Sequence, residues 1–111
     1  MLNTEKRGDI YVVTFTVGKI NALVTEEIRS EIYTIFDRQG SKVVFDLTGV
    51  DYMDSSGFGV FLSALRKAKD SYSHIRLTGL TPHVVGLFET LHLDTVFEIY
   101  ADREECISTF R

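Results

Sequence analysis

Two adjacent serines, Ser55 and Ser56, form the part of the chain with the clearest chemical potential. Asp54 precedes them and Gly57 follows them. The apolar run at residues 43–47 indicates a strand, and apolar residues after the serines recur at helical spacing. The serines therefore lie at a strand-to-helix turn, where free backbone N–H groups and the helix dipole favour negative charge. A reversible phosphate at this turn would change the charge of the surrounding surface in one step.

Other interpretations of this turn have weaker support from the sequence. A serine hydrolase would need a histidine beside Ser55 and an oxyanion hole, and the G-x-S-x-G pattern is absent. Gly57 and Gly59 form a lone G-x-G without the remaining glycine and the ribose-binding acid of a dinucleotide loop. We therefore expect no catalytic residue, and expect both glycines to allow close packing of the helix on the sheet. The simplest alternative is that Asp54 and Ser55 only cap the helix.

The residue types that bind metals or form disulfides give little sign of a further site. His74, His83 and His92 recur every nine residues, a spacing that does not share one helical face, and no cysteine or carboxylate pattern joins them. We expect no metal and no other cofactor. Cys106 is the single cysteine, which excludes an internal disulfide and fits a reducing compartment. Its apolar neighbours favour a buried side chain that is not a nucleophile.

The composition is typical of an ordinary globular protein. With 111 residues, 44% of them hydrophobic and 25% charged, the chain is long enough for one domain, which we expect at residues 1–111. The net charge of −4 argues against nucleic-acid binding, which requires a clustered basic face. Apolar stretches fall short of the ~18 residues of a membrane span, and the first residues lack a signal-peptide pattern. We therefore expect a cytoplasmic protein without membrane insertion.

Strand and helix patterns alternate along the chain, which indicates an α/β fold. Strands are predicted at residues 2–5, 10–16, 42–47, 75–78 and 96–100. Helices are predicted at residues 25–39 with Gly40 closing the helix, at 55–69, from Thr81 and Pro82 onward, and at 102–110. This alternation requires crossover connections, and hence a mixed, mostly parallel sheet of about four to five strands packed with about four helices.

Residues 43–60 resemble the signature of STAS domains, specifically the bacterial anti-sigma factor antagonists, and residues 77–82 and 87–97 resemble their third strand-helix unit. The similarity extends over essentially the whole chain. It implies a single STAS domain that binds an anti-sigma factor, usually a serine kinase with a GHKL-type ATP site. In such systems the unphosphorylated antagonist captures the anti-sigma factor and releases the sigma factor. The kinase then phosphorylates one serine and the complex dissociates, until a PP2C-type phosphatase resets the antagonist. Members of this kind are substrates and not enzymes.

Matching the motif position by position makes Ser55 the phosphorylated serine and Ser56 its unmodified neighbour. The resemblance implies a partner-binding surface around them, and we assign to it these residues: Asn21, Asp54, Ser55, Ser56, Gly57 and Phe58. Asn21 stands where many antagonists carry an acid, and Lys19 replaces a carboxylate. Phe58 and Tyr52 are either core residues or interface anchors.

The sequence also predicts how a phosphate would act at this turn. Because the helix dipole favours an anion at its N-terminus, phosphorylation should change binding without unfolding the domain. Asp46, Asp51 and Asp54 are expected to make the surrounding edge acidic. A second hypothesis, from a different class, is an accessory STAS subunit of a phospholipid ABC transporter, which would bind its ATPase constitutively while the serine served as a cap.

Overall fold

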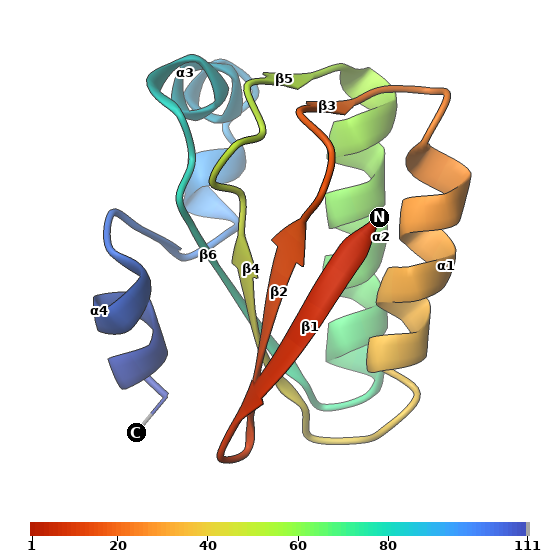
Figure 1. Ribbon diagram of the computed structural model, residues 1–111, viewed down its shortest axis with the longest axis vertical. Coiled ribbons are helices and arrows are strands. Elements are labelled where there is room, and N and C mark those ends of the chain that lie inside the picture. Colours follow the sequence, from red (N-terminus) through yellow and green to blue (C-terminus); the bar gives the residue numbers. More distant parts are fainter. Residues whose placement is uncertain (111) are drawn as a thin grey trace.

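A five-stranded mixed sheet forms the centre of the computed structural model, which describes residues 1–110 (Figure 1). Its strands, in spatial order, are β1 (Leu2–Arg7), β2 (Ile10–Phe15), β4 (Lys42–Asp46), β6 (His74–Thr78) and β7 (Ile99–Tyr100). β1 runs antiparallel to β2, and the remaining neighbours are parallel. The predicted α/β class with a mostly parallel sheet is confirmed.

Helices lie on both faces of this sheet. α1 (Thr25–Ile35) and α2 (Ser55–Asp70) run side by side over one face, whereas α4 (Arg103–Ser108) lies against the other (Figure 1). α3 (Pro82–Thr90) begins as predicted, with the hydroxyl of its N-cap Thr81 accepting the N–H of Val84. A short 3₁₀ turn, η1 (Leu93–Thr95), follows it. Within residues 1–110, each helix is too short or too polar to cross a bilayer.

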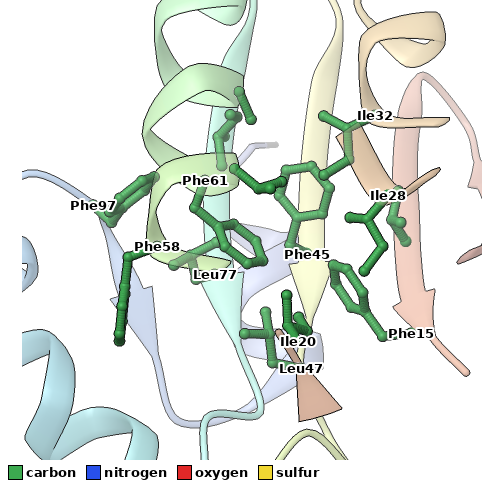
Figure 2. Packing of buried hydrophobic residues seen from close by; sticks show 14 of the residues in the cluster. Phe15, Ile20, Ile28, Ile32, Phe45, Leu47, Phe58, Phe61, Leu77 and Phe97 are labelled. Atoms are coloured by element: carbon green, nitrogen blue, oxygen red, sulfur yellow. The ribbon is translucent and has the colours of Figure 1, made fainter. Parts of the chain in front are cut away.

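The core follows from the alternation of side chains along the central strand. Val43 and Phe45 of β4 point toward α1 and α2, while Val44 points toward α4 and packs near Cys106. Phe45 meets Phe61 of α2 edge-on, with ring centroids 5.7 Å apart (Figure 2). These buried contacts fix α2 on the sheet.

Two predicted elements differ from the structure. The helix predicted to reach residue 39 ends at Ile35, because Phe36 turns into the core and its N–H bonds to Tyr33 in a tighter turn. Gly40 therefore does not close that helix; it adopts φ +73° in the turn before β4. Of the strand predicted at 96–100, only Ile99 and Tyr100 are extended.

The reason lies in Phe97. Its ring is buried against Phe88, at a centroid distance of 6.0 Å, and its N–H bonds to the carbonyl of Leu93. Burying this ring bends the segment out of the extended conformation. Core packing has overridden local β propensity here.

A second, two-stranded sheet was not predicted. β3 (Lys19–Ile20) pairs in parallel with β5 (Tyr52–Met53) at the end of the main sheet from which α1 and α2 begin (Figure 1). Two-residue strands are too short to show the alternation that identifies strands in a sequence. This small sheet places the segment after β3 beside the start of α2.

The two glycines early in α2 differ in their surroundings, so only half of the sequence expectation is correct. A Cβ on Gly57 would lie 2.5 Å from Met53 Cγ and 2.8 Å from the carbonyl oxygen of Ile20. Gly57 thus allows α2 to approach the small sheet. A Cβ on Gly59 would meet nothing within 4 Å, so close packing does not explain this glycine.

This contrast yields a matched pair of variants. Gly57→Ala should destabilise the protein by about 1–3 kcal/mol, because the methyl group must push α2 away from β5. Gly59→Ala should stabilise it by about 0.5–1 kcal/mol, because alanine restricts the unfolded chain and fits an open helical position. Urea unfolding of both variants checks this. Equal effects would contradict the close approach at Gly57.

Candidate functional site

Ser55 is the first residue of α2 and is exposed to solvent. β5 leads directly into it, and the preceding residue, Asp54, has extended backbone angles of φ −98° and ψ −174° and serves as the N-cap. Ser55 therefore occupies the strand-to-helix turn that the sequence predicts. Its side chain lies at the positive end of a 16-residue helix.

The carboxylate of Asp54 organises this turn. Its Oδ1 accepts the backbone N–H of Ser56 at 3.0 Å and that of Gly57 at 3.1 Å. The same oxygen accepts the hydroxyl of Ser56. These bonds, above all the one from the Ser56 hydroxyl, hold the pKa of the Asp54 carboxyl below its usual value.

The two serines consequently differ. The hydroxyl of Ser56 is held inside the cap, and its residue is half-buried. Ser55 is exposed, and its hydroxyl makes no hydrogen bond to any group among residues 1–110, histidines included. Of the two, Ser55 is the one whose oxygen is available to an enzyme from outside.

The segment after β3 is joined to the same cap. Oδ2 of Asp54 accepts the N–H of Ala22 at 3.3 Å, and the Asp54 N–H donates to the Ile20 carbonyl at 3.2 Å. Asn21 follows Ile20, whose register partner is Met53, so Asn21 lies beside Asp54 at the next position. Its own side-chain oxygen accepts the N–H of Leu23 at 3.0 Å and shapes the turn into α1.

The predicted binding residues thus divide into two groups. Asn21, Asp54, Ser55 and Ser56 come together at one end of the molecule and have some exposure. Gly57 and Phe58 are buried, and the ring of Phe58 packs edge-on against Phe88 at 5.2 Å. Their burial favours a role in supporting the start of α2 over direct contact with a partner. Of the two interpretations of Phe58, core residue or interface anchor, burial favours the core residue.

Asp46 does not belong to the acidic edge near Ser55, contrary to the sequence-based expectation. It is 4% exposed and faces α4, on the opposite side of the sheet from α2. Its Oδ1 accepts the N–H of Thr48 at 3.0 Å. The acidic residues that remain exposed or partly exposed near the turn are Asp51 and Asp54.

Sequence reasoning missed two apolar residues of this surface. Leu23, in the segment bonded to Asp54, is 92% exposed. Leu62 is 42% exposed and lies seven residues after Ser55, hence on the same helical face. Leu23 could have been identified because it is a large apolar side chain in a short segment that shows neither strand nor helix periodicity. Such a segment gives the side chain no expected place in the core.

The comparisons with known proteins agree with this architecture. A family model for the STAS domain matches residues 1–106. The anti-sigma-B factor antagonist of Listeria monocytogenes is 30% identical over 98 residues, which cover 88% of this chain and 86% of that protein. An anti-sigma-factor antagonist (STAS) domain protein from Planctomyces limnophilus has a TM-score of 0.89 at 20% identity, covering 99% of this chain and 97% of its own.

The solved structures also include SpoIIAA in two states. Its unphosphorylated form matches with a TM-score of 0.80 at 25% identity, covering 100% of this chain and 96% of its own. The phosphorylated form of Bacillus SpoIIAA matches with a TM-score of 0.73 at 24% identity, covering all of both chains.

The Asp54 cap predicts a pH dependence of stability. Because the pKa of Asp54 is lowered by folding, its contribution is complete above the unfolded value of about 3.9 and is lost as the pH falls through the folded value. Asp54→Asn keeps a good N-cap side chain but removes this titration. The thermal midpoint of the wild type should therefore fall more steeply in acid than that of Asp54→Asn.

Asp51→Asn is the control for the change in net charge, because the Asp51 carboxylate accepts no hydrogen bond within residues 1–110. The thermal midpoint of Asp51→Asn should fall more steeply in acid than that of Asp54→Asn, because Asp51→Asn keeps the Asp54 cap. Identical slopes for the wild type and Asp54→Asn would show that the Asp54 carboxylate does not stabilise the turn.

Proposed function

The chain belongs to the STAS domain family, and on this basis we propose that it is an anti-sigma factor antagonist controlled by phosphorylation of Ser55. Its unphosphorylated form binds an anti-sigma factor and so frees a sigma factor. Phosphorylation of Ser55 breaks that complex. The Listeria relative named an anti-sigma-B factor antagonist and SpoIIAA, solved in unphosphorylated and phosphorylated forms, support this proposal.

The difference between the two serines is the observation that carries the proposal. Ser55 is exposed at the helix N-terminus, whereas the Ser56 hydroxyl is bound to Asp54. A kinase can reach the Ser55 oxygen without breaking the cap. The resulting phosphate would lie at the positive end of α2, where the dipole and nearby N–H groups favour it. Phosphorylation at Ser55 is therefore compatible with the folded domain.

The same phosphate would oppose binding. It adds about 1.5 to 2 negative charges and three acceptor oxygens to a surface that already carries Asp51 and Asp54. At an interface, the added group must also be desolvated or accommodated by the partner. A loss of about 2–4 kcal/mol would reduce affinity by roughly 30- to 1,000-fold, which is sufficient for a switch.

The partners follow from the same role. We assign the anti-sigma factor to the GHKL-type serine kinases and the resetting enzyme to the PP2C-type phosphatases. The chain itself acts as their substrate, without catalytic activity, in the cytoplasm. Leu23 and Leu62 supply apolar contacts beside Ser55, while Asn21 and Asp54 supply polar ones. Protein interfaces usually combine central apolar anchor residues with a polar rim.

The first test substitutes each serine in turn. Ser55→Ala should bind the anti-sigma factor kinase as the wild type does and should resist release when ATP is added. Ser55→Asp should bind more weakly with an almost unchanged thermal midpoint, because the helix N-terminus tolerates the charge. Ser56→Ala, the matched control, should still be released by ATP. Titration calorimetry with and without ATP measures these differences.

Release of Ser55→Ala by ATP, together with loss of release in Ser56→Ala, would overturn the assignment of the phosphorylated residue. Unfolding of Ser55→Asp would contradict the claim that the helix start tolerates a charged group.

The second test concerns the apolar contact. Leu23→Ser should weaken binding to the anti-sigma factor by at least tenfold, because it removes an exposed anchor of the type that dominates interfaces. Leu91→Ser is the matched control, since Leu91 is 50% exposed at the C-terminal end of α3. Both variants should keep their thermal midpoints. If Leu23→Ser binds the partner as tightly as Leu91→Ser does, Leu23 is excluded from the interface.

A further inference from the structure

A polar cleft opens on the face of the sheet opposite α1 and α2. Its volume is about 550 Å³, and it lies between the carboxyl ends of the central strands and the start of α4. Its walls include residues from β2, β4, β6 and α4, namely Thr14, Asp46, Thr78 and Arg103. In sheets of this kind, the carboxyl ends of parallel strands are the usual place for ligands.

Three of these side chains form one row across the sheet. Thr14 is the register partner of Asp46, and Asp46 is that of Thr78. The row just before it, on the same face, contains the buried Val12 and Val44. The third member of that row is Arg76, the register partner of Val44, whose guanidinium pairs with Glu98 and stacks on Phe110. This face therefore becomes fully polar only at the row of Thr14, Asp46 and Thr78. Such a row of polar groups is costly to bury without partners.

Two buried groups in the cleft lack such partners. Thr78 is 0% exposed, and its hydroxyl makes no hydrogen bond within residues 1–110. Nε of Arg103 is also buried without a hydrogen-bond partner in the same part of the chain. Nearly all buried polar groups in proteins are satisfied by protein, water or ligand. These two therefore mark where an occupant would bind.

The rest of the cleft is held in a fixed geometry. Oδ1 of Asp46 accepts both the N–H and the hydroxyl of Thr48. Gly79, at φ +73°, approaches this pair so closely that a Cβ would lie 2.8 Å from the Thr48 nitrogen and even nearer to both side chains. Arg103 reaches across to Asp46 Oδ2 at 3.5 Å and to Glu5 at 3.3 Å. Only glycine at position 79 permits this close approach to Asp46 and Thr48.

An ion-pair network holds α4 above the cleft. Nη1 of Arg7 donates to both carboxylate oxygens of Glu104 at 2.8 Å, and its Nε donates to Glu5. Glu5 also pairs with Arg103, so the β1–β2 hairpin is tied to the start of α4. Charge-assisted hydrogen bonds of this kind are shorter and stronger than bonds between neutral groups.

The charges of the lining select the class of occupant. Asp46 and Asp102 carry two negative charges against the single positive charge of Arg103. An inorganic anion such as phosphate is therefore disfavoured. The unpartnered Arg103 Nε needs an acceptor, the Thr78 hydroxyl can donate and accept, and Asp46 accepts. Hydroxyl groups of a ligand satisfy all three requirements because each can donate and accept.

We propose that this cleft binds a small neutral molecule with several hydroxyl groups, of about the size of a monosaccharide. The ligand's oxygens accept from Arg103 and exchange hydrogen bonds with Thr78, and one of its hydroxyls donates to Asp46. This site is separate from Ser55, since it faces α4 and lies on the other side of the sheet from α2. It does not depend on the function proposed for the serine.

The test titrates the full-length, ¹⁵N-labelled protein with D-ribose, myo-inositol and inorganic phosphate. At least one of the two polyols should give saturable shifts of the Thr78, Gly79 and Asp46 amides, whereas phosphate should not. Thr78→Val removes the hydroxyl with little change of shape and should weaken polyol binding about tenfold. Its thermal midpoint should not fall, because the hydroxyl has no partner to lose. Thr95→Val, in η1, is the control and should bind as the wild type does.

Arg103→Lys provides an independent variant, because it keeps the charge but removes the Nε donor, and it should also weaken binding. Shifts that rise linearly with polyol concentration, or that persist in both Thr78→Val and Arg103→Lys, would show that water alone satisfies these groups and would overturn the site. Saturable shifts with phosphate alone would overturn the neutral class of ligand.

Discussion

A single carboxylate, that of Asp54, determines the geometry on which the proposed switch depends. One of its oxygens closes the first turn of α2, and the other holds the segment after β3 through Ala22. Gly57 completes this junction by letting the helix approach the small sheet. Because the Ser56 hydroxyl is taken up by the cap, Ser55 is left as the exposed hydroxyl at the helix start. The distinction between the two serines is thus a consequence of capping.

The same local motif occurs twice along one stretch of chain. Asp46 accepts the N–H and the hydroxyl of Thr48, two residues on, just as Asp54 does from Ser56. Each motif ends a strand and turns the chain. The two carboxylates nevertheless serve opposite faces of the sheet, Asp46 beneath α4 and Asp54 at the start of α2. The stretch between them therefore joins the polar cleft to the site around Ser55.

The fold was largely predictable, because its signals are periodic. Apolar alternation and helical spacing identified the main strands and helices, and Thr81 with Pro82 marked the start of α3. The errors arose where packing of a single ring decided the backbone. Phe36 ended α1 early, and Phe97 bent the segment before β7. Neither effect is visible in local propensity.

The candidate site was predictable in its centre but not in its surroundings. The motif placed Ser55 at the helix start, whereas the pairing of β3 with β5 had no sequence signal and brought Leu23 to the same surface. Asp46 was misplaced because its distance in sequence from Asp54 gives no information about which face of the sheet it occupies. Burial of Phe58 likewise depends on Phe88, a residue from a different helix.

The proposed switch requires that phosphate on Ser55 separate this protein from an anti-sigma factor. To test this, the purified protein is incubated with ATP and the proposed GHKL-type kinase, and the phosphate is located by mass spectrometry. The affinity of the modified form for the anti-sigma factor is then measured. We expect one phosphate, on Ser55, and an affinity reduced by roughly 30- to 1,000-fold. A phosphate on Ser55 that leaves the affinity unchanged would contradict the proposed switch.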